Sequence, residues 1–99
     1  MVEFILKRDG RREKFHREKI TWAIFKAATA CGGDDFERAE YLTDQVVEII
    51  KQKYKNSIPD VEGVQDIVEK VLIENGHAQT AKAYILYREK RKSARELNA

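Results

Sequence analysis

Basic side chains gather near both ends of this 99-residue chain, and they are the side chains best suited to hold a ligand. Residues 7–19 contain seven Lys or Arg against three Asp or Glu, and residues 88–96 contain five against two. Lys and Arg near the start of a helix hold phosphate groups through charge-assisted hydrogen bonds. If the two segments meet in the fold, they form a cationic pocket for a small polyanion such as a triphosphate. Judged by charge alone, the pattern is as typical of ordinary solvent-exposed faces as of a ligand pocket.

The residue types that carry out catalysis or bind metals are sparse. Cys31 is the only cysteine, and the two histidines, His16 and His77, are isolated, so neither a zinc site nor a catalytic triad is indicated. The chain has no glycine-rich phosphate loop and no carboxylate pair for magnesium, which argues against a kinase or an ATPase. The sequence therefore predicts no catalytic residue and no metal ligand.

Length and composition favour one globular domain. Hydrophobic residues make up 42% of the chain and charged residues 36%, a balance typical of folded proteins. No run of about 18 apolar residues is present, and the first residues lack the basic start and apolar stretch of a signal peptide. We therefore expect a cytoplasmic protein that has no membrane partner.

Residues 2–15 have the pattern of a β-hairpin. Apolar and polar side chains alternate before Asp9-Gly10, the dipeptide that a two-residue type I′ turn favours. Such a turn pairs Phe4 with Phe15, so that the two rings share a face, and it leaves like-charged arginines opposite each other beside the turn. Residues 56–58 have the pattern of a very short third strand, which Pro59 confines to the edge or the end of a sheet.

Four segments show helical periodicity: residues 17–31, 35–54, 61–75 and 77–97. Asp34 or Asp35 is the expected N-cap of the second helix, and Asp60 is that of the third. The glycines after residues 31 and 75 are typical of helix ends. The apolar stripes of the helices include Ile24, Val46, Ile50, Leu72 and Tyr84, together with Cys31, the stem of Lys53 and Tyr87. The residues therefore predict four helices with a small hairpin lid.

Two separated segments carry a family resemblance. The first is Lys7-Arg8-Asp9-Gly10 with Glu13, followed by Arg17-Glu18-Lys19-Ile20, and the second comprises residues 64–72 and 81–88. Together they resemble the ATP-cone domain over residues 2 to about 92. The resemblance implies an α+β, mostly helical fold, a four-helix bundle capped by a small three-stranded β-sheet of the hairpin and a strand near 56–58. Residues 1–92 would form the domain, and 93–99 a polar tail or a linker to another domain.

ATP-cone domains regulate ribonucleotide reductases, the enzymes of deoxyribonucleotide synthesis, and do not themselves carry out chemistry. The resemblance therefore implies an allosteric domain whose ligand is ATP or dATP, with or without Mg²⁺. Its partner would be a reductase catalytic domain or another cone. The last two helices are most similar to those of anaerobic and cobalamin-dependent reductases. A fragment of such an enzyme and a stand-alone cone both remain open.

The resemblance assigns the phosphate contacts to basic residues. The matching side chains are Lys7, Arg8, Lys19 and, in the last helix, Lys90 or its neighbours Arg88 and Arg91. All of them belong to the two basic segments, so the resemblance and the charge pattern indicate the same pocket.

The remaining contacts implied by the resemblance concern the base and the sugar. Glu13 matches a carboxylate that accepts from the adenine amino group, which favours adenine over guanine. Ile5 and Ile20 match apolar walls around the base. His16 stands where the family often has Asn or Asp near the sugar, and Gln65 lies at the start of the third helix, where the family also approaches the nucleotide.

The alternative function is a nucleic-acid-binding or transcription-regulator module of the reductase-repressor type. The basic hairpin and the run 88–95 would then contact a phosphate backbone. Residues 33–75 carry eleven acidic against five basic side chains, however, and no recognition helix is evident. In the repressor, zinc-ribbon cysteines precede the domain, and this sequence has none at that place. Nucleic acid is therefore the less favoured partner.

Overall fold

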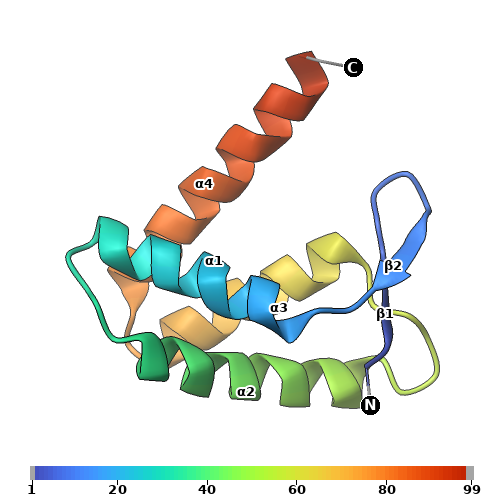
Figure 1. The fold of residues 1–99 in the computed structure, drawn as a ribbon, viewed down its shortest axis with the longest axis horizontal. Helices are drawn as coiled ribbons and strands as arrows, with labels where there is room; N and C mark the ends of the chain where they lie inside the picture. The colour runs from blue at the N-terminus through green and yellow to red at the C-terminus, as the bar shows by residue number, and fades with distance from the viewer. Residues whose placement is uncertain (1, 98–99) are drawn as a thin grey trace.

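A computed structural model describes residues 2–97, with side chains for residues 2–94, and contains four helices and one β-hairpin (Figure 1). The elements are β1 (Phe4–Leu6), β2 (Arg12–Lys14), α1 (Arg17–Ala30), α2 (Phe36–Lys53), α3 (Val61–Glu74) and α4 (Ala78–Leu97). α1 packs against α2 and α4, and α3 packs against the same two helices, so the four surround one core. The predicted helices and hairpin lid are confirmed.

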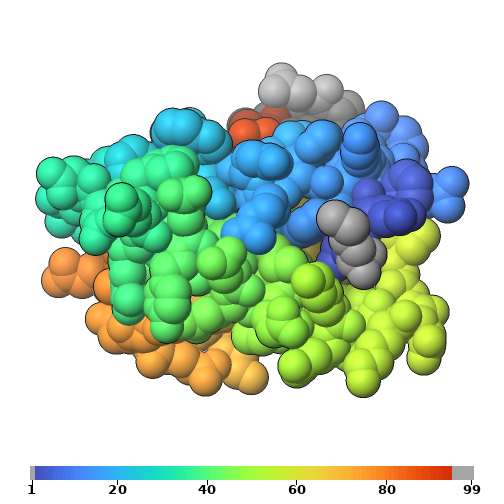
Figure 2. Space-filling model, turned by 60° about the horizontal axis from the view of Figure 1, so that its bottom comes forward, coloured from blue at the N-terminus to red at the C-terminus, as the bar shows by residue number. Residues whose placement is uncertain are grey.

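The two ends of the bundle carry different connections. The hairpin and the segment between α2 and α3 lie at one end, and the α1–α2 and α3–α4 turns lie at the other (Figures 1 and 2). The second half of α4 projects from the bundle (Figure 1), and residues 89–94 are exposed. The expected polar tail is thus helical as far as Leu97, and residues 98–99 lie outside the described part. No helix within residues 2–97 combines the length and apolar character needed to cross a bilayer.

Local sequence signals place the helix ends where they were expected. Asp35 caps α2 by accepting from the backbone N–H of Arg38 at 2.9 Å. Asp60 caps α3 by accepting from the N–H of Gly63 at 3.1 Å. Gly32 follows α1 with φ +88°, a left-handed conformation that side chains disfavour. Because these caps depend on near neighbours in the chain, the helix boundaries follow from the sequence.

The predicted apolar stripes form the core of the bundle. Ile24, Val46, Ile50 and Leu72, from the first three helices, are at most 1% exposed, and Tyr84 of α4 is also buried. Such complete burial of apolar side chains is the main source of stability in a domain of this size.

Three side chains that were expected on these stripes are exposed. Cys31 and Lys53 face solvent because each lies at the very end of its helix. Tyr87 is 41% exposed and lies near the middle of α4, whose second half projects from the bundle (Figure 1).

A buried pair of hydroxyl groups joins α1 to α2. Thr21 Oγ1 donates to Thr43 Oγ1 at 2.8 Å, and Thr43 Oγ1 donates to the carbonyl oxygen of Ala39 at 2.8 Å. Thr43 is fully buried and Thr21 nearly so. The two polar groups satisfy each other inside the core, which removes most of the cost of their burial.

The hairpin turn differs from the prediction. Gly10 N–H donates to the carbonyl of Lys7 at 2.9 Å, and Lys7 N–H donates to the carbonyl of Arg11 at 2.8 Å, so the loop has three residues rather than two. A type I′ turn would require positive φ at Asp9 as well as at Gly10. Of these two residues only Gly10 has it, with φ +86°. The Asp9 carboxylate instead accepts from the backbone N–H of Arg11 at 3.0 Å and fastens the longer loop.

The longer loop moves the strand register by one residue. Phe4 lies opposite Lys14, not opposite Phe15, so the predicted pairing of the two rings is wrong. Phe4 is 36% exposed with the Arg12 guanidinium 4.5 Å above its ring centroid, whereas Phe15 packs against the core. The two rings therefore lie on opposite faces of the hairpin.

The third strand expected at 56–58 does not form in the described structure, and the sheet found there has two strands. The segment meets β1 slightly later, where Leu6 N–H donates to the carbonyl of Pro59 at 2.9 Å and Leu6 forms one parallel bridge with Asp60. Pro59 has no N–H to continue the ladder, and Asp60 already caps α3. The contact is therefore limited to one point.

Candidate functional site

A cavity of about 280 Å³ lies where the hairpin, the starts of α1 and α3 and the middle of α4 come together. Most of the residues predicted to contact a nucleotide line it: Ile5, Lys7, Glu13, His16, Lys19, Ile20, Gln65 and Arg88. The basic segment near the N-terminus supplies Lys7 and Lys19, and the later one supplies Arg88 and Arg91. The expected meeting of the two basic segments is confirmed.

Two of the predicted contacts do not line this cavity. Arg8 Nη2 lies 3.3 Å from Glu62 Oε1, an ion pair that joins the hairpin turn to the start of α3. Lys90 is exposed on α4 and is absent from the lining, whereas its neighbours Arg88 and Arg91 are part of it. Of the three basic residues considered on α4, the structure therefore favours these two arginines.

Several lining residues were not predicted to contact a nucleotide: Lys14, Phe15, Ala23, Val64, Tyr84 and Tyr87. The two tyrosines on α4 could have been predicted from their spacing relative to the arginines of the same helix. Tyr84, Tyr87, Arg88 and Arg91 are separated by three, one and three residues, the spacing of one helix face. Phe15 depends on the hairpin register, which was predicted wrongly from the sequence.

The observed hairpin register places four side chains over the cavity. Residues directly opposite each other in an antiparallel pair point to the same face, and successive residues alternate. Ile5 lies opposite Glu13, so Lys7 and Phe15 share their face. All four line the cavity. The hairpin therefore contributes an apolar wall, a cation and a carboxylate to one site.

The lining is strongly cationic. Four Lys or Arg residues line the cavity together with one carboxylate: Lys7, Lys19, Arg88 and Arg91, with Glu13. Lys14 also borders the cavity, but the hairpin register places its side chain on the opposite face, with Phe4. Lys7 Nζ lies 3.6 Å from Glu13 Oε2. A concave site with this excess of positive charge attracts small polyanions.

One of these cations is already engaged by carboxylates. Arg88 Nη1 donates to Asp66 Oδ1 at 2.9 Å and to Glu69 Oε1 at 2.7 Å. Burial favours the neutral form of Arg88, but these hydrogen bonds outweigh it, so the pKa of the guanidinium lies above its usual value. Arg88 therefore stays charged and links α4 to α3.

The two tyrosines of the lining differ in their electrostatic surroundings. Burial raises the pKa of the Tyr84 phenol above its usual range. At Tyr87 the hydrogen bond from Arg91 and the nearby charge of Lys26 lower the pKa of the phenol. Tyr84 thus presents a neutral ring to the interior, and Tyr87 a polar hydroxyl beside cations.

The rest of the lining is apolar and contains one unsatisfied polar atom. Ile20, Val64 and Tyr84 are buried. Gln65 Oε1 is also buried, and it has no hydrogen-bond partner among the described residues. A buried carbonyl oxygen without a donor is costly unless a ligand or water supplies one. Apolar walls, a lone acceptor and several cations suit a ligand that joins a flat ring with N–H or O–H donors to a polyanion.

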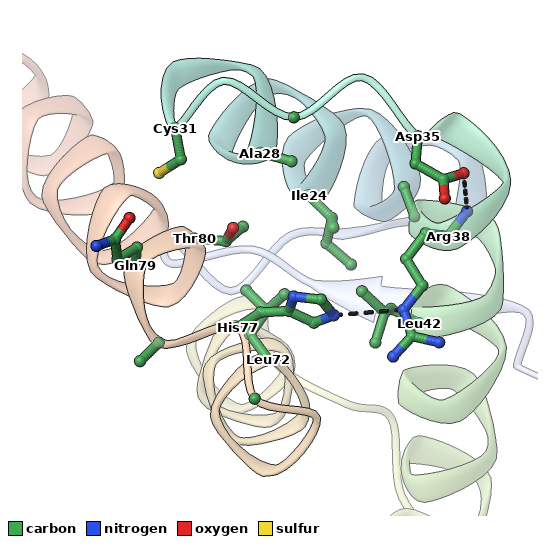
Figure 3. Close-up of a pocket in the computed structure, with 14 residues that line it drawn as sticks. Ile24, Ala28, Cys31, Asp35, Arg38, Leu42, Leu72, His77, Gln79 and Thr80 are labelled. Atoms are coloured by element: carbon green, nitrogen blue, oxygen red, sulfur yellow. Dashed lines mark hydrogen bonds between the residues drawn. The ribbon is translucent and has the colours of Figure 1, made fainter.

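A larger hollow of about 410 Å³ lies at the opposite end of the bundle, between the α1–α2 turn and the start of α4 (Figure 3). None of the predicted contact residues lines it. Its charged side chains are Arg38 and Asp35, and Arg38 Nε donates to His77 Nε2 at 3.3 Å. Because one acid balances one base there, this hollow lacks the positive charge that a triphosphate requires. The hairpin cavity is therefore the candidate site.

Known proteins share this segment of chain. The chain is 42% identical, over 97% of its length, to a vitamin B12-dependent ribonucleoside-diphosphate reductase of Thermoplasma acidophilum. It is 36% identical, over 97% of its length, to an anaerobic ribonucleoside-triphosphate reductase of Salmonella typhimurium. It is 39% identical, over 93% of its length, to a ribonucleoside-diphosphate reductase subunit alpha of Chlamydia muridarum. The chain spans only 10–13% of the length of these relatives.

A family model described as the ATP cone domain matches residues 3–93. The match includes the hairpin, the first three helices, α4 as far as residue 93, and every residue that lines the candidate cavity. The chain therefore belongs to the ATP cone domain family, the class of regulatory domain that its sequence predicted.

Proposed function

We propose that this domain binds ATP or dATP in the hairpin cavity and thereby regulates the activity of a cytoplasmic ribonucleotide reductase, without chemistry of its own. The observation that carries the proposal is the convergence of basic side chains from both ends of the chain on one cavity with apolar walls. The adenine ring would pack on the apolar walls and the triphosphate would face the cations. Mg²⁺, where present, would arrive bound to the phosphates.

Each group of the nucleotide has a proposed partner. Lys7 and Lys19 hold the phosphates through charge-assisted hydrogen bonds, and the arginines of α4 complete the set. Glu13 accepts from the adenine amino group, whereas guanine presents a carbonyl oxygen at the equivalent position. Gln65 Oε1 accepts a further hydrogen bond from the base or the sugar.

Regulation requires that the nucleotide favours one arrangement of the helices over another. Two ligands that differ by one hydroxyl group, such as ATP and dATP, act differently only if they stabilise the two arrangements unequally, typically by about 1–3 kcal/mol. The hairpin and α4 both contribute to the cavity and would transmit its occupancy. The partner that reads this change is a reductase catalytic domain or another cone.

Calorimetry on the 99-residue chain tests the proposal. ATP and dATP at tens of micromolar should give binding heat, and GTP should bind more weakly. Lys7→Ala combined with Lys19→Ala should lower ATP affinity more than tenfold, since bonds to charged groups contribute roughly 1.5–3 kcal/mol each. Lys70→Ala combined with Lys82→Ala removes the same charge from exposed positions outside the cavity and should have little effect.

Two results would reject the proposal. One is the absence of heat with either adenine nucleotide while circular dichroism shows a folded helical domain. The other is tight binding of duplex DNA with steep salt dependence, which would favour the nucleic-acid-binding alternative.

A further inference from the structure

Arg88 faces the candidate cavity but is held by two carboxylates of the neighbouring helix. Its Nη1 donates to Asp66 Oδ1 and Glu69 Oε1 at 2.9 and 2.7 Å. The Arg88 side chain is 16% exposed and that of Glu69 is 20% exposed, so solvent screens this pair less than a surface ion pair. The Asp66 side chain, at 66% exposed, lies further out.

The local charge of this cluster is unfavourable for a polyanion. One guanidinium and two carboxylates sum to −1, beside a cavity that is otherwise cationic. A phosphate that takes a hydrogen bond from Arg88 must weaken the bonds from Arg88 to α3 or accept the repulsion of both carboxylates. The phosphate and the two carboxylates therefore compete for hydrogen bonds from the Arg88 guanidinium.

We propose that Glu69 and Asp66 set the nucleotide affinity of the cavity by competing with the phosphates for Arg88. The inference rests on the proposed function, because it assumes a phosphate-bearing ligand at this site. Arg88 bonds to α3 in the structure, and it would bond to phosphate when a nucleotide is bound. Neither Asp66 nor Glu69 lines the cavity, so they act through Arg88 and not by contact with the ligand.

The competition links occupancy of the cavity to the contact between α3 and α4. When Arg88 turns to the phosphate, Glu69 loses a hydrogen-bonded cation while only partly exposed, a costly state for a carboxylate. The cost is relieved if α3 shifts or if a partner surface supplies a cation to this pair.

The test measures ATP affinity by calorimetry in the 99-residue chain and three variants. Glu69→Gln should bind ATP about three- to tenfold more tightly, because it removes one competitor. Arg88→Gln should bind roughly tenfold more weakly. The decisive variant carries both changes: the gain from Glu69→Gln should vanish when Arg88 is absent. Glu74→Gln is the matched control, because it removes the same charge from an exposed position on α3 outside the cavity and should leave the affinity unchanged.

Other outcomes would overturn the inference. Weaker binding by Glu69→Gln would mean that the carboxylate positions Arg88 instead of competing for it. A gain that persists in the Arg88→Gln background would be a general electrostatic effect. If Glu69→Gln does not fold, Asp66→Asn at the more exposed carboxylate is the substitute, and it should likewise increase ATP affinity. If the unaltered chain binds no adenine nucleotide, the proposed function fails, whereas normal binding with no effect of either carboxylate variant rejects only this inference.

Discussion

Ile5 lies directly opposite Glu13 in the hairpin, and this pairing decides which side chains face the cavity. A two-residue turn would have placed Glu13 opposite Leu6, on the other face from Lys7. The three-residue loop instead brings the apolar wall, the cation and the carboxylate together. The candidate site therefore depends on the geometry of a turn that contributes no side chain to it.

Gly10 should be the most sensitive position of that turn. Its φ of +86° is left-handed, and a Cβ added there would meet no atom within 4 Å, so a substitution is penalised only through the backbone. Gly10→Val should lower the free energy of unfolding by about 1–2 kcal/mol. Gly10→Asn should cost less, because asparagine tolerates this conformation. Urea unfolding of both variants measures the difference, and equal losses would contradict the assigned turn.

Thr21 and Thr43 should show strong non-additivity. Thr43→Val alone removes one partner of a buried hydrogen bond and should destabilise the domain by about 1–3 kcal/mol, because the Thr21 hydroxyl loses that partner. The double replacement by valine keeps the shape and removes both hydroxyls, so its cost should be smaller than the sum of the single costs. A double-mutant cycle from urea unfolding gives the coupling energy. Simple additivity would show that the two hydroxyls do not depend on each other.

Tyr84 should make the domain sensitive to high pH. Burial raises the pKa of its phenol in the folded state above the value near 10 of an unfolded chain. Its contribution is therefore complete below pH about 10, and it is lost as the pH rises toward the folded-state pKa, because the unfolded state releases this proton first. The free energy of unfolding of the unaltered chain should therefore fall relative to that of Tyr84→Phe as the pH rises above about 10, and it should not change relative to the variant at lower pH. Other tyrosines and lysines titrate in both proteins and cancel, so parallel pH curves would contradict the prediction.

The helices were predictable because their signals are local. Asp35 and Asp60 each cap a helix by accepting from a backbone N–H three residues away. Gly32 follows the end of α1 and has the left-handed φ that terminates a helix. The hairpin register was not predictable in the same way, because Asp-Gly suits both a two-residue turn and the three-residue loop that forms. A difference of one residue in the loop then decided the position of Phe15.

The site was predictable where it rests on residue type and family resemblance, and not where it rests on packing. Lys7 and Lys19 belong to a segment whose charge and motif both indicate a phosphate site. The engagement of Arg88 by Glu69 depends on how α3 meets α4, and 19 residues separate the two side chains. The exclusion of Lys90 depends on which face of α4 turns toward the cavity. Tertiary contacts of this kind leave no local pattern in one sequence.

Gln65 offers a test in which stability and binding should move in opposite directions. Its Oε1 is buried without a partner among the described residues, so Gln65→Met, which keeps the length of the side chain and removes the carbonyl, should raise the free energy of unfolding of the ligand-free protein by about 1 kcal/mol. The same variant should bind ATP roughly tenfold more weakly, because a donor of the nucleotide loses its acceptor. Gln45→Met is the matched control: Gln45 accepts from Asn75 Nδ2 at 2.9 Å, so its loss should destabilise the domain and leave ATP affinity unchanged. Thermal unfolding with and without ATP measures both quantities. If Gln65→Met were destabilising like the control, an unseen partner would satisfy the carbonyl, and its role in holding the nucleotide would be wrong.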